Sequence, residues 1–211
     1  MADREKKHGA GPWTEPFIGH QFERILAPGA IDAAVLIPLV ENEETGEWSI
    51  LFELRSSDIE QGGEVCFPGG RVEEGENAED TVIRECMEEL LIGREQIEVT
   101  APFFKMTGPG GAEISCYLGI LYDYEGTFGK DEVQYVFKIP VRELLQMKPV
   151  IHDSVYELNP GDNFPYHLIQ GGRRYHWHKI RKRYYFYETE YEVIWGMTAE
   201  LLYHYLEKIR S

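Results

Sequence analysis

Apolar residues gather in short runs through much of this chain, separated by polar, glycine-bearing or proline-bearing segments, a pattern typical of strands. Two such runs, 32–40 and 48–55, flank the polar segment 41–46 and predict a hairpin. Further apolar runs, separated by loops rich in Gly, Pro or acidic residues, predict strands at 96–105, 114–122 and 133–139. The chain should therefore contain a substantial sheet.

In other segments the apolar residues recur at helical spacing instead of forming such runs. One apolar stripe of helical period predicts a helix whose buried side carries Val82, Ile83, Cys86, Met87, Leu90 and Leu91. Segments 141–147 and 198–209 predict two further helices. Strands interleaved with helices in this order predict an α/β fold, with a mixed sheet lying between helices.

The first of these helices also carries a set of carboxylates. Glu85, Glu88 and Glu89 stand at i, i+3 and i+4, so they fall within one arc of roughly 100°. With the apolar stripe against the core, these acids are expected to point outward. Like charges at such spacing cost roughly 0.2–0.5 kcal/mol per pair, and a bound cation would turn the repulsion into attraction. Spacing alone favours a solvated acidic surface, so the wider pattern has to decide.

A longer pattern surrounds these acids. Gly70 is followed by five residues, Glu76, seven residues and then the run Arg84-Glu85-Cys86-Met87-Glu88-Glu89-Leu90-Leu91-Ile92. This arrangement resembles the Nudix box, which runs glycine, five residues, glutamate, seven residues and Arg-Glu-apolar-x-Glu-Glu-x-Gly-apolar. The departure is Leu91, where the family has glycine. We expect Gly93 to end the helix two residues later.

Resemblance to the Nudix superfamily implies an α/β/α sandwich and hydrolysis of a diphosphate that depends on Mg²⁺ or Mn²⁺. The implied metal ligands are Glu85, Glu88, Glu89 and Gly70, the last through its backbone carbonyl. Glu88 would hold metal or help to orient water, which makes it a candidate catalytic residue. Oxygen ligands suit magnesium, which keeps several waters and binds substrate phosphate. Glu76 and Arg84 would form an ion pair that fixes the loop against the helix.

The segment 51–70 resembles a second signature, found upstream of the box in the coenzyme A pyrophosphatase branch. The matching positions are Arg55, Ser56, Gly63 and Phe67 to Gly70. Glu60 stands where that signature has another arginine, and one residue is missing before Gly63. Arg55 and Ser56 would bind substrate. The positive charge missing at Glu60 would come from Arg71, from Lys105 or from the basic segment near the C-terminus.

Two later segments agree with the same branch. Residues 194–199 resemble the Ile-Trp-Gly-x-Thr-Ala segment that opens its last helix, and here we expect Trp195 to pack in the core while Gly196 or Thr198 starts the helix. Residues 131–140 resemble its acidic start followed by an apolar strand. By this resemblance Glu132 would act as the base or complete the metal site; the alternative is a solvated acid at a strand edge.

Basic residues gather between Arg173 and Arg183, where they alternate with Tyr, His and Trp. This segment could grip a nucleotide phosphate or adenine. It could equally be an amphipathic strand of a solvated hairpin, with its basic side chains in water. His176 and His178 lack a third ligand nearby, so they do not predict a metal site.

Composition narrows the remaining possibilities. The 211 residues predict a single domain over 13–211, after a loose polar tail over 1–12 that lacks the apolar core of a signal peptide. A formal net charge of −16 opposes nucleic-acid binding. No apolar run is long enough to cross a bilayer. The cysteines, Cys66, Cys86 and Cys116, lack metal-ligand spacing and are expected to be reduced thiols in a cytoplasmic protein.

Together these features predict a Mg²⁺- or Mn²⁺-dependent Nudix pyrophosphohydrolase acting on a small nucleoside diphosphate linked to another moiety. Coenzyme A or its derivatives are favoured, with phosphopantetheine and adenosine 3′,5′-bisphosphate as products. ADP-ribose, NADH or another nucleotide diphosphate is the alternative within the family. A non-catalytic, nucleotide-sensing module is the alternative from another class, and a homodimer is left open.

Overall fold

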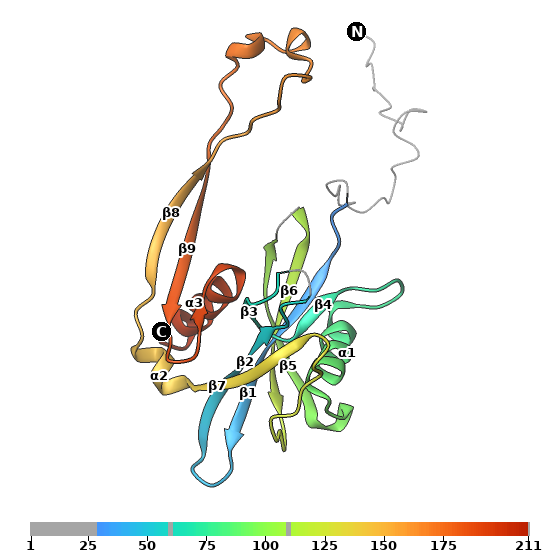
Figure 1. Cartoon of the computed structure of the whole chain (residues 1–211), viewed down its shortest axis with the longest axis vertical. Coiled ribbons are helices and arrows are strands. Elements are labelled where there is room, and N and C mark those ends of the chain that lie inside the picture. Colours follow the sequence, from blue (N-terminus) through green and yellow to red (C-terminus); the bar gives the residue numbers. More distant parts are fainter. Residues whose placement is uncertain (1–28, 59–60, 109–110, 211) are drawn as a thin grey trace, which may run out of the picture.

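The computed structural model describes residues 29–58, 61–108 and 111–210 (Figure 1). The predicted tail over 1–12, and Glu60 in the upstream signature, lie outside the described residues. The predicted extent of a single domain, 13–211, stays a prediction.

The described residues form a main sheet of seven strands: β1 (Ala33–Asn42), β2 (Glu47–Arg55), β3 (Val65–Cys66), β4 (Gly69–Arg71), β5 (Ile97–Thr107), β6 (Glu113–Leu121) and β7 (Val133–Pro140). Their order is β3-β2-β1-β6-β5, while β4 pairs with β1 and β7 with β2. The pair β1–β6 is parallel and the pair β1–β2 antiparallel, so the sheet is mixed.

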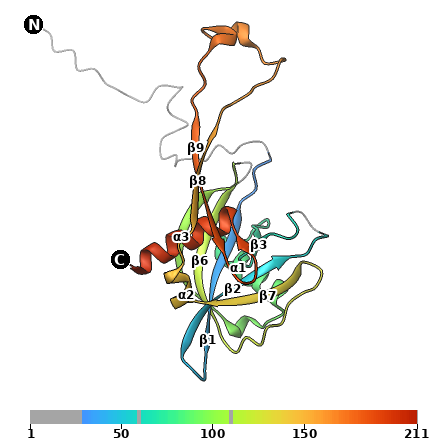
Figure 2. The same ribbon diagram turned by 60° about the vertical axis from the view of Figure 1, so that its left-hand side comes forward.

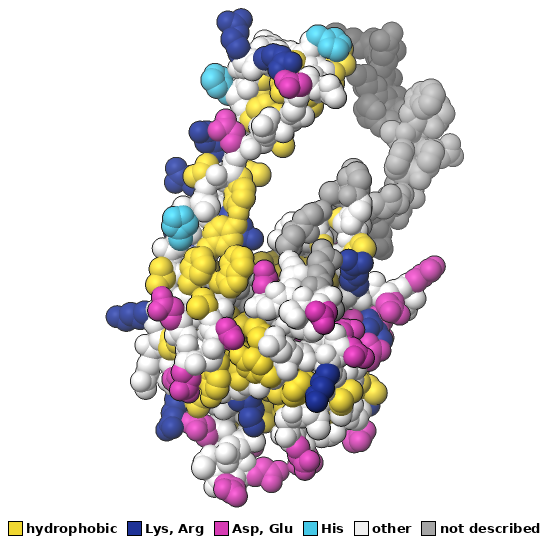
Figure 3. Space-filling model, viewed as in Figure 1, with side chains coloured by type: hydrophobic (Ala, Val, Ile, Leu, Met, Phe, Trp, Pro, Cys, Tyr) yellow, Lys and Arg dark blue, Asp and Glu magenta, His cyan; other side chains and the backbone are white. Residues whose placement is uncertain are grey.

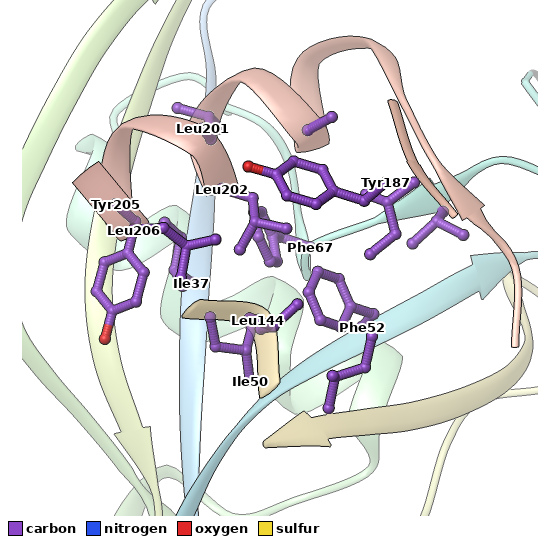
Figure 4. Close-up of a cluster of buried hydrophobic side chains, with 14 of the residues drawn as sticks. Ile37, Ile50, Phe52, Phe67, Leu144, Tyr187, Leu201, Leu202, Tyr205 and Leu206 are labelled. Carbon is purple, nitrogen blue, oxygen red and sulfur yellow. The ribbon is translucent and has the colours of Figure 1, made fainter. Parts of the chain in front are cut away.

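Helices cover both faces of this sheet: α1 (Ala78–Leu90), α2 (Val141–Gln146) and α3 (Gly196–Arg210). Successive residues of β2 show why two layers are needed, because Leu51 packs with α1 while Ile50 and Phe52 belong to the opposite cluster. In that cluster Leu144 of α2 and Leu202 of α3 lie over Ile50 and Phe52 (Figure 4). The fold is the expected α/β/α sandwich.

A second, smaller sheet of three strands is present in the described residues: β8 (Val150–Tyr156), β9 (Ile180–Glu188) and β10 (Val193–Ile194). We call residues 150–188 the arm, because β8, β9 and their connection project from the body of the molecule (Figures 1 and 2). The base of the arm is anchored where the Tyr185 ring stacks on Tyr203 of α3, with 4.1 Å between centroids. Short 3₁₀ turns at Tyr166–Leu168 and Gly172–Arg174 form its tip.

The predicted strands and helices are confirmed, each within a few residues of its expected bounds. The basic segment ends in β9, which pairs with β8, so the hairpin alternative describes its backbone. Strand β8 was not predicted, because its apolar residues fall in two pairs at its ends and form neither an alternation nor a continuous run; almost all of its residues are exposed. Among the described residues, no helix has the length and apolar character needed to span a membrane.

Two local predictions are wrong. Trp195 is 42% exposed and lies parallel to Phe186, because α3 begins at Gly196 with its apolar side formed by later residues. The box helix does not continue to Gly93. It ends at Leu91, which itself adopts the left-handed conformation, with φ 53° and ψ 47°, and its side chain is 59% exposed.

Candidate metal and diphosphate site

The box helix begins at a well-defined cap. The Asn77 side chain accepts hydrogen bonds from the backbone N–H groups of Glu79 and Asp80, at 2.9 and 3.0 Å. These bonds satisfy donors that have no partner within the helix, and acids in the first turn favour the positive end of its dipole. The cap therefore fixes where α1 starts, and with it the direction of every carboxylate further along.

Arg84 joins the loop before the helix to the helix itself. Its Nε donates to Glu76 Oε1 at 3.0 Å and its Nη2 to Glu76 Oε2 at 3.1 Å, while Nη2 also donates to the carbonyl of Arg71 at 3.1 Å. This fork on a carboxylate is the strong geometry of arginine. The hydrogen bonds from Arg84 lower the pKa of Glu76 to about 2. The ion pair expected from the box is thus present, and it holds the turn 71–76 against α1.

The box glutamates do not all face water, contrary to the expectation that the acids point outward. Glu85 is 9% exposed and Glu89 is 3% exposed, whereas Glu88 is exposed. The reason is tertiary, because the turn between β3 and β4 folds over this side of the helix. The backbone N–H of Gly69 donates to Glu89 Oε2 at 2.8 Å.

The two glycines of this turn are required by the close approach of the helix. A Cβ at Gly70 would lie 2.1 Å from Glu85 Oε1. Gly69 has φ 150°, and a Cβ there would meet the carbonyl oxygen of Ala34 at 2.3 Å. Glycine at both positions lets the backbone of β4 reach the carboxylates directly. The half-buried Gly70 therefore borders the Glu85 carboxylate.

Burial changes the acid–base properties of these groups. Desolvation raises the pKa of Glu89 to about 8, against the opposing hydrogen bond from Gly69, and the nearby Glu85 raises it further. Desolvation also raises the pKa of Glu85, while the Arg84 hydrogen bond lowers it. Without a cation, these two carboxylates are therefore costly to ionise where the fold places them.

The structure adds a residue that the sequence analysis missed, Glu53 on β2. It is 0% exposed, and Cys66 Sγ donates to its Oε2 at 3.7 Å. Burial raises the pKa of Glu53 well above its ordinary value, and the charge of Glu89 raises it further. The sequence does contain a signal for this residue, because Glu53 is a single acid within the apolar run Ile50–Leu54.

The remaining predicted residues lie around this group in different ways. Glu132 is exposed, but its charge raises the pKa values of Glu53, Glu85 and Glu89, so it is close to the buried acids. Its carbonyl accepts a hydrogen bond from the Ser56 N–H at 2.8 Å. The charge of Arg55, at the end of β2, acts on both Glu53 and Glu89 in the opposite direction.

The three candidate sources of the missing positive charge lie in different parts of the structure. Arg71 is exposed at the end of β4, and its carbonyl is held by Arg84. Lys105 pairs with Glu113 on the neighbouring strand at 2.6 Å. The basic segment lies on the arm, whose tip is remote from α1 in both views (Figures 1 and 2). Of the three candidates, Arg71 is the one beside the box loop.

An open hollow of about 320 Å³ lies on the outer side of α1, lined by residues that include Arg84, Glu88 and Arg94. The buried acids Glu85 and Glu89 are not among its lining residues. Glu88 lines this hollow, and it shares the Arg84 guanidinium with the buried Glu85.

The donors fit a hard divalent cation. In the described part of the chain, no three acidic, His or Cys side chains already converge closely enough to hold a metal ion. Arg84 Nη1 donates to Glu85 Oε1 at 2.8 Å and to Glu88 Oε2 at 3.2 Å, so these two carboxylates are engaged by the arginine. The available donors are nevertheless carboxylate and backbone oxygens, the ligands that Mg²⁺ and Mn²⁺ prefer, and the buried oxygen Glu53 Oε1 has no hydrogen-bond partner.

Comparison with known proteins agrees with the box. A protein from Caenorhabditis elegans named Nudix hydrolase 3 is 34% identical over 119 residues, which are 54% of this chain and 49% of that protein. This chain thus spans about half the length of that relative. A protein from Enterobacter sp. (strain 638), named Uncharacterized Nudix hydrolase NudL, is 29% identical over 173 residues, covering 81% of this chain and 78% of that protein.

Among solved structures, the binary complex of a C. elegans Ap4A hydrolase has a TM-score of 0.46 at 20% identity, covering 56% of this chain and 85% of that one. A family model described as NUDIX domain matches residues 31–158, more than half of this chain, and includes the box and β1 to β8. The chain therefore belongs to the Nudix family.

Proposed function

We propose that this protein hydrolyses a nucleoside diphosphate linked to another moiety, with Mg²⁺ or Mn²⁺, and that coenzyme A or a derivative is its substrate. Water would add across the diphosphate bridge, which gives phosphopantetheine and adenosine 3′,5′-bisphosphate when coenzyme A is cleaved. The observation that carries the proposal is the close approach of Glu85 and Glu89 to the glycines of β4, where the Gly69 N–H donates to Glu89 and no space remains for a side chain between Gly70 and Glu85.

A bound divalent cation would supply neutralising charge to the diphosphate and a more acidic water. Glu85, Glu88, Glu89 and the Gly70 carbonyl are the proposed ligands. Arg84 would release Glu85 and Glu88, whose carboxylates would then hold the cation. It would keep its fork on Glu76, which holds the loop in place. Glu88 and Glu132, both exposed, are the acids that can accept a proton from attacking water.

Coenzyme A is proposed because the upstream segment and residues 194–199 resemble that branch of the family. Arg55 and Ser56 lie at the end of β2, and the hydrogen bond from the Ser56 N–H to the Glu132 carbonyl supports their assignment to the same site as Glu132. Arg71 would add positive charge at the edge of β4. Arginine offers the planar donor fork that suits diphosphate oxygens.

The test is product analysis of the full chain incubated with coenzyme A, ADP-ribose, NADH and a nucleoside triphosphate, each with Mg²⁺ or Mn²⁺. Glu89→Gln is the inactive variant, and Glu41→Gln, an exposed glutamate at the far end of β1, is the charge-matched control. We expect metal-dependent release of adenosine 3′,5′-bisphosphate from coenzyme A by the wild type and the control.

Preferential cleavage of ADP-ribose or NADH would overturn the substrate and keep the reaction class. Nucleotide binding without turnover of any substrate would overturn the enzyme assignment and favour a nucleotide-sensing module.

A further inference from the structure

We propose that Glu53, which lies on β2 outside the Nudix box, is a further carboxylate ligand of the divalent cation. The proposal rests on the function proposed above, because it assigns a residue to the same site. Glu53 is 0% exposed, and its buried oxygen Oε1 has no hydrogen-bond partner.

The strand directs Glu53 toward the box helix. Side chains alternate between the two faces of a strand, so Glu53 shares the face of Leu51. Leu51 packs in the cluster formed with Val82, Cys86 and Leu90 of α1. Phe52 and Leu54 belong to the opposite cluster. The Glu53 carboxylate therefore projects between the sheet and α1, on the side from which Glu89 is buried.

The backbone around Glu53 prevents the side chain from reaching water. Glu53 pairs with Cys66 of β3 on one side and with Val136 of β7 on the other, so its strand is interior at this point. The Cys66 thiol donates to Oε2, and the described structure provides no donor for Oε1. An unpartnered carboxylate oxygen in such a position costs free energy unless something binds it.

The groups that face Glu53 come from four elements around it. Glu89 of α1 and Glu132 before β7 repel its charge, Arg55 at the end of β2 attracts it, and Cys66 of β3 donates to it. Carboxyl groups from α1, β2 and the turn before β7 thus outnumber the single arginine that acts on them. A divalent cation is the partner that satisfies an oxygen in this setting, because it binds several carboxylates at once.

A structural alternative makes a different prediction about stability. If Glu53 served only to hold β3 through Cys66, its replacement would weaken the metal-free fold. If Glu53 serves the cation, the metal-free protein carries it at a cost, so Glu53→Gln should unfold in urea with EDTA at a midpoint equal to or above that of the wild type. The amide preserves the shape of the side chain and removes the charge.

The deciding experiment is titration of the full chain with Mn²⁺ alone, following free Mn²⁺ by electron paramagnetic resonance. We expect Glu53→Gln to weaken Mn²⁺ binding by about tenfold or more, the range found when groups supporting a metal site are removed. The control Glu41→Gln removes the same charge from β1 at an exposed position and should bind as the wild type does.

Binding by Glu53→Gln within about twofold of the wild type would overturn the inference, as would a lower urea midpoint without metal and unchanged affinity. If this variant does not fold, Glu53→Asp decides in the same titration: retraction of the carboxylate by one methylene must weaken binding, and unchanged binding overturns the inference. Mn²⁺ binding by the wild type without hydrolysis of any diphosphate would overturn the proposed function, while the comparison of variants still judges Glu53.

Discussion

The box helix gathers acidic side chains and the arm carries the basic segment, and the fold places these charges in opposite surroundings. On α1, Glu85 and Glu89 are buried beneath the glycine turn, and burial raises their pKa values. On the arm, Arg183 pairs with Asp153 at 2.7 and 2.9 Å across β8 and β9, and both remain exposed to water. Figure 3 shows Lys and Arg side chains around the tip of the arm and hydrophobic side chains along its length.

This difference shows that a concentration of charge in the sequence is not by itself a binding site. Exposed ions interact weakly because water and salt screen them, and the arm satisfies its cations with local partners such as Asp162 for Arg173. Water does not screen the repulsion between buried carboxylates, so binding a cation between them gives more electrostatic stabilisation than binding one at an exposed site. This contrast supports the proposal that the chemistry lies at α1.

The largest expected effect is loss of hydrolysis in Glu89→Gln. The amide keeps the bond from the Gly69 N–H and removes the buried negative charge, so the metal-dependent rate should fall by about 100-fold or more. Steady-state kinetics with the preferred substrate measures it, beside circular dichroism to verify folding. A rate within a few fold of the wild type would remove Glu89 from the site.

The next effect concerns two similar arginine forks in different surroundings. Arg84→Lys keeps the charge and loses the fork on Glu76, which should cost about 1.5–3 kcal/mol of the free energy of unfolding. Arg183→Lys makes the same change in the exposed pair with Asp153 and should cost much less. Urea unfolding compares them. Equal losses would show that burial does not distinguish the two regions.

The pH dependence of metal-free stability should follow Glu89. Its folded pKa of about 8 exceeds its ordinary value of 4.5, so between these values the folded protein holds a proton that the unfolded chain has released. The free energy of unfolding therefore falls as the pH rises through this window, by up to about 1.4 kcal/mol per pH unit for a full proton. Thermal melts in EDTA from pH 5 to pH 8 should show a flatter profile for Glu89→Gln. Identical profiles would contradict the buried state of this acid.

A smaller effect is expected at the end of the box helix. Leu91 is left-handed and exposed, so Leu91→Gly should stabilise the protein by about 0.5–1 kcal/mol through relief of this conformation. Leu91→Ala is the matched control, because it removes the side chain and retains the Cβ. Chemical denaturation distinguishes them, and a destabilised glycine variant would mean that side-chain contacts outweigh the strain.

The smallest effect should come from the arm. The double variant Arg173→Ala, Arg174→Ala removes exposed cations remote from α1, so we expect KM and kcat to change by less than about twofold. Initial-rate measurements across substrate concentrations provide the comparison. A large rise in KM would show that the arm reaches substrate and would end the contrast between the two regions.

Local sequence chemistry predicted much of the fold. The apolar runs at 32–40 and 48–55 indicated β1 and β2, because a strand between two helical layers buries side chains on both of its faces. The exposed strand β8 gave no such signal. The prediction for Trp195 was wrong because an aromatic residue before a helix favours burial, whereas here its ring stacks on Phe186 and stays 42% exposed.

The same limit applies to the site. Spacing along one helix grouped Glu85, Glu88 and Glu89, because helical periodicity is a local property. It did not reveal which of them would be covered, since that depends on the turn of β4. Glu53 is distant in sequence from the box, so only the pairing of β2 with β3 and β7 brings it under α1.

The sequence by itself determined the box helix, the ion pair partners Glu76 and Arg84, and the family, because these depend on local periodicity or on fixed spacing. Tertiary structure decided the burial of Glu85 and Glu89, the approach of the β4 glycines, the place of Glu53 and the separation of the arm. Those features arise from contacts between segments far apart in the chain, and burial then sets what each charge can do.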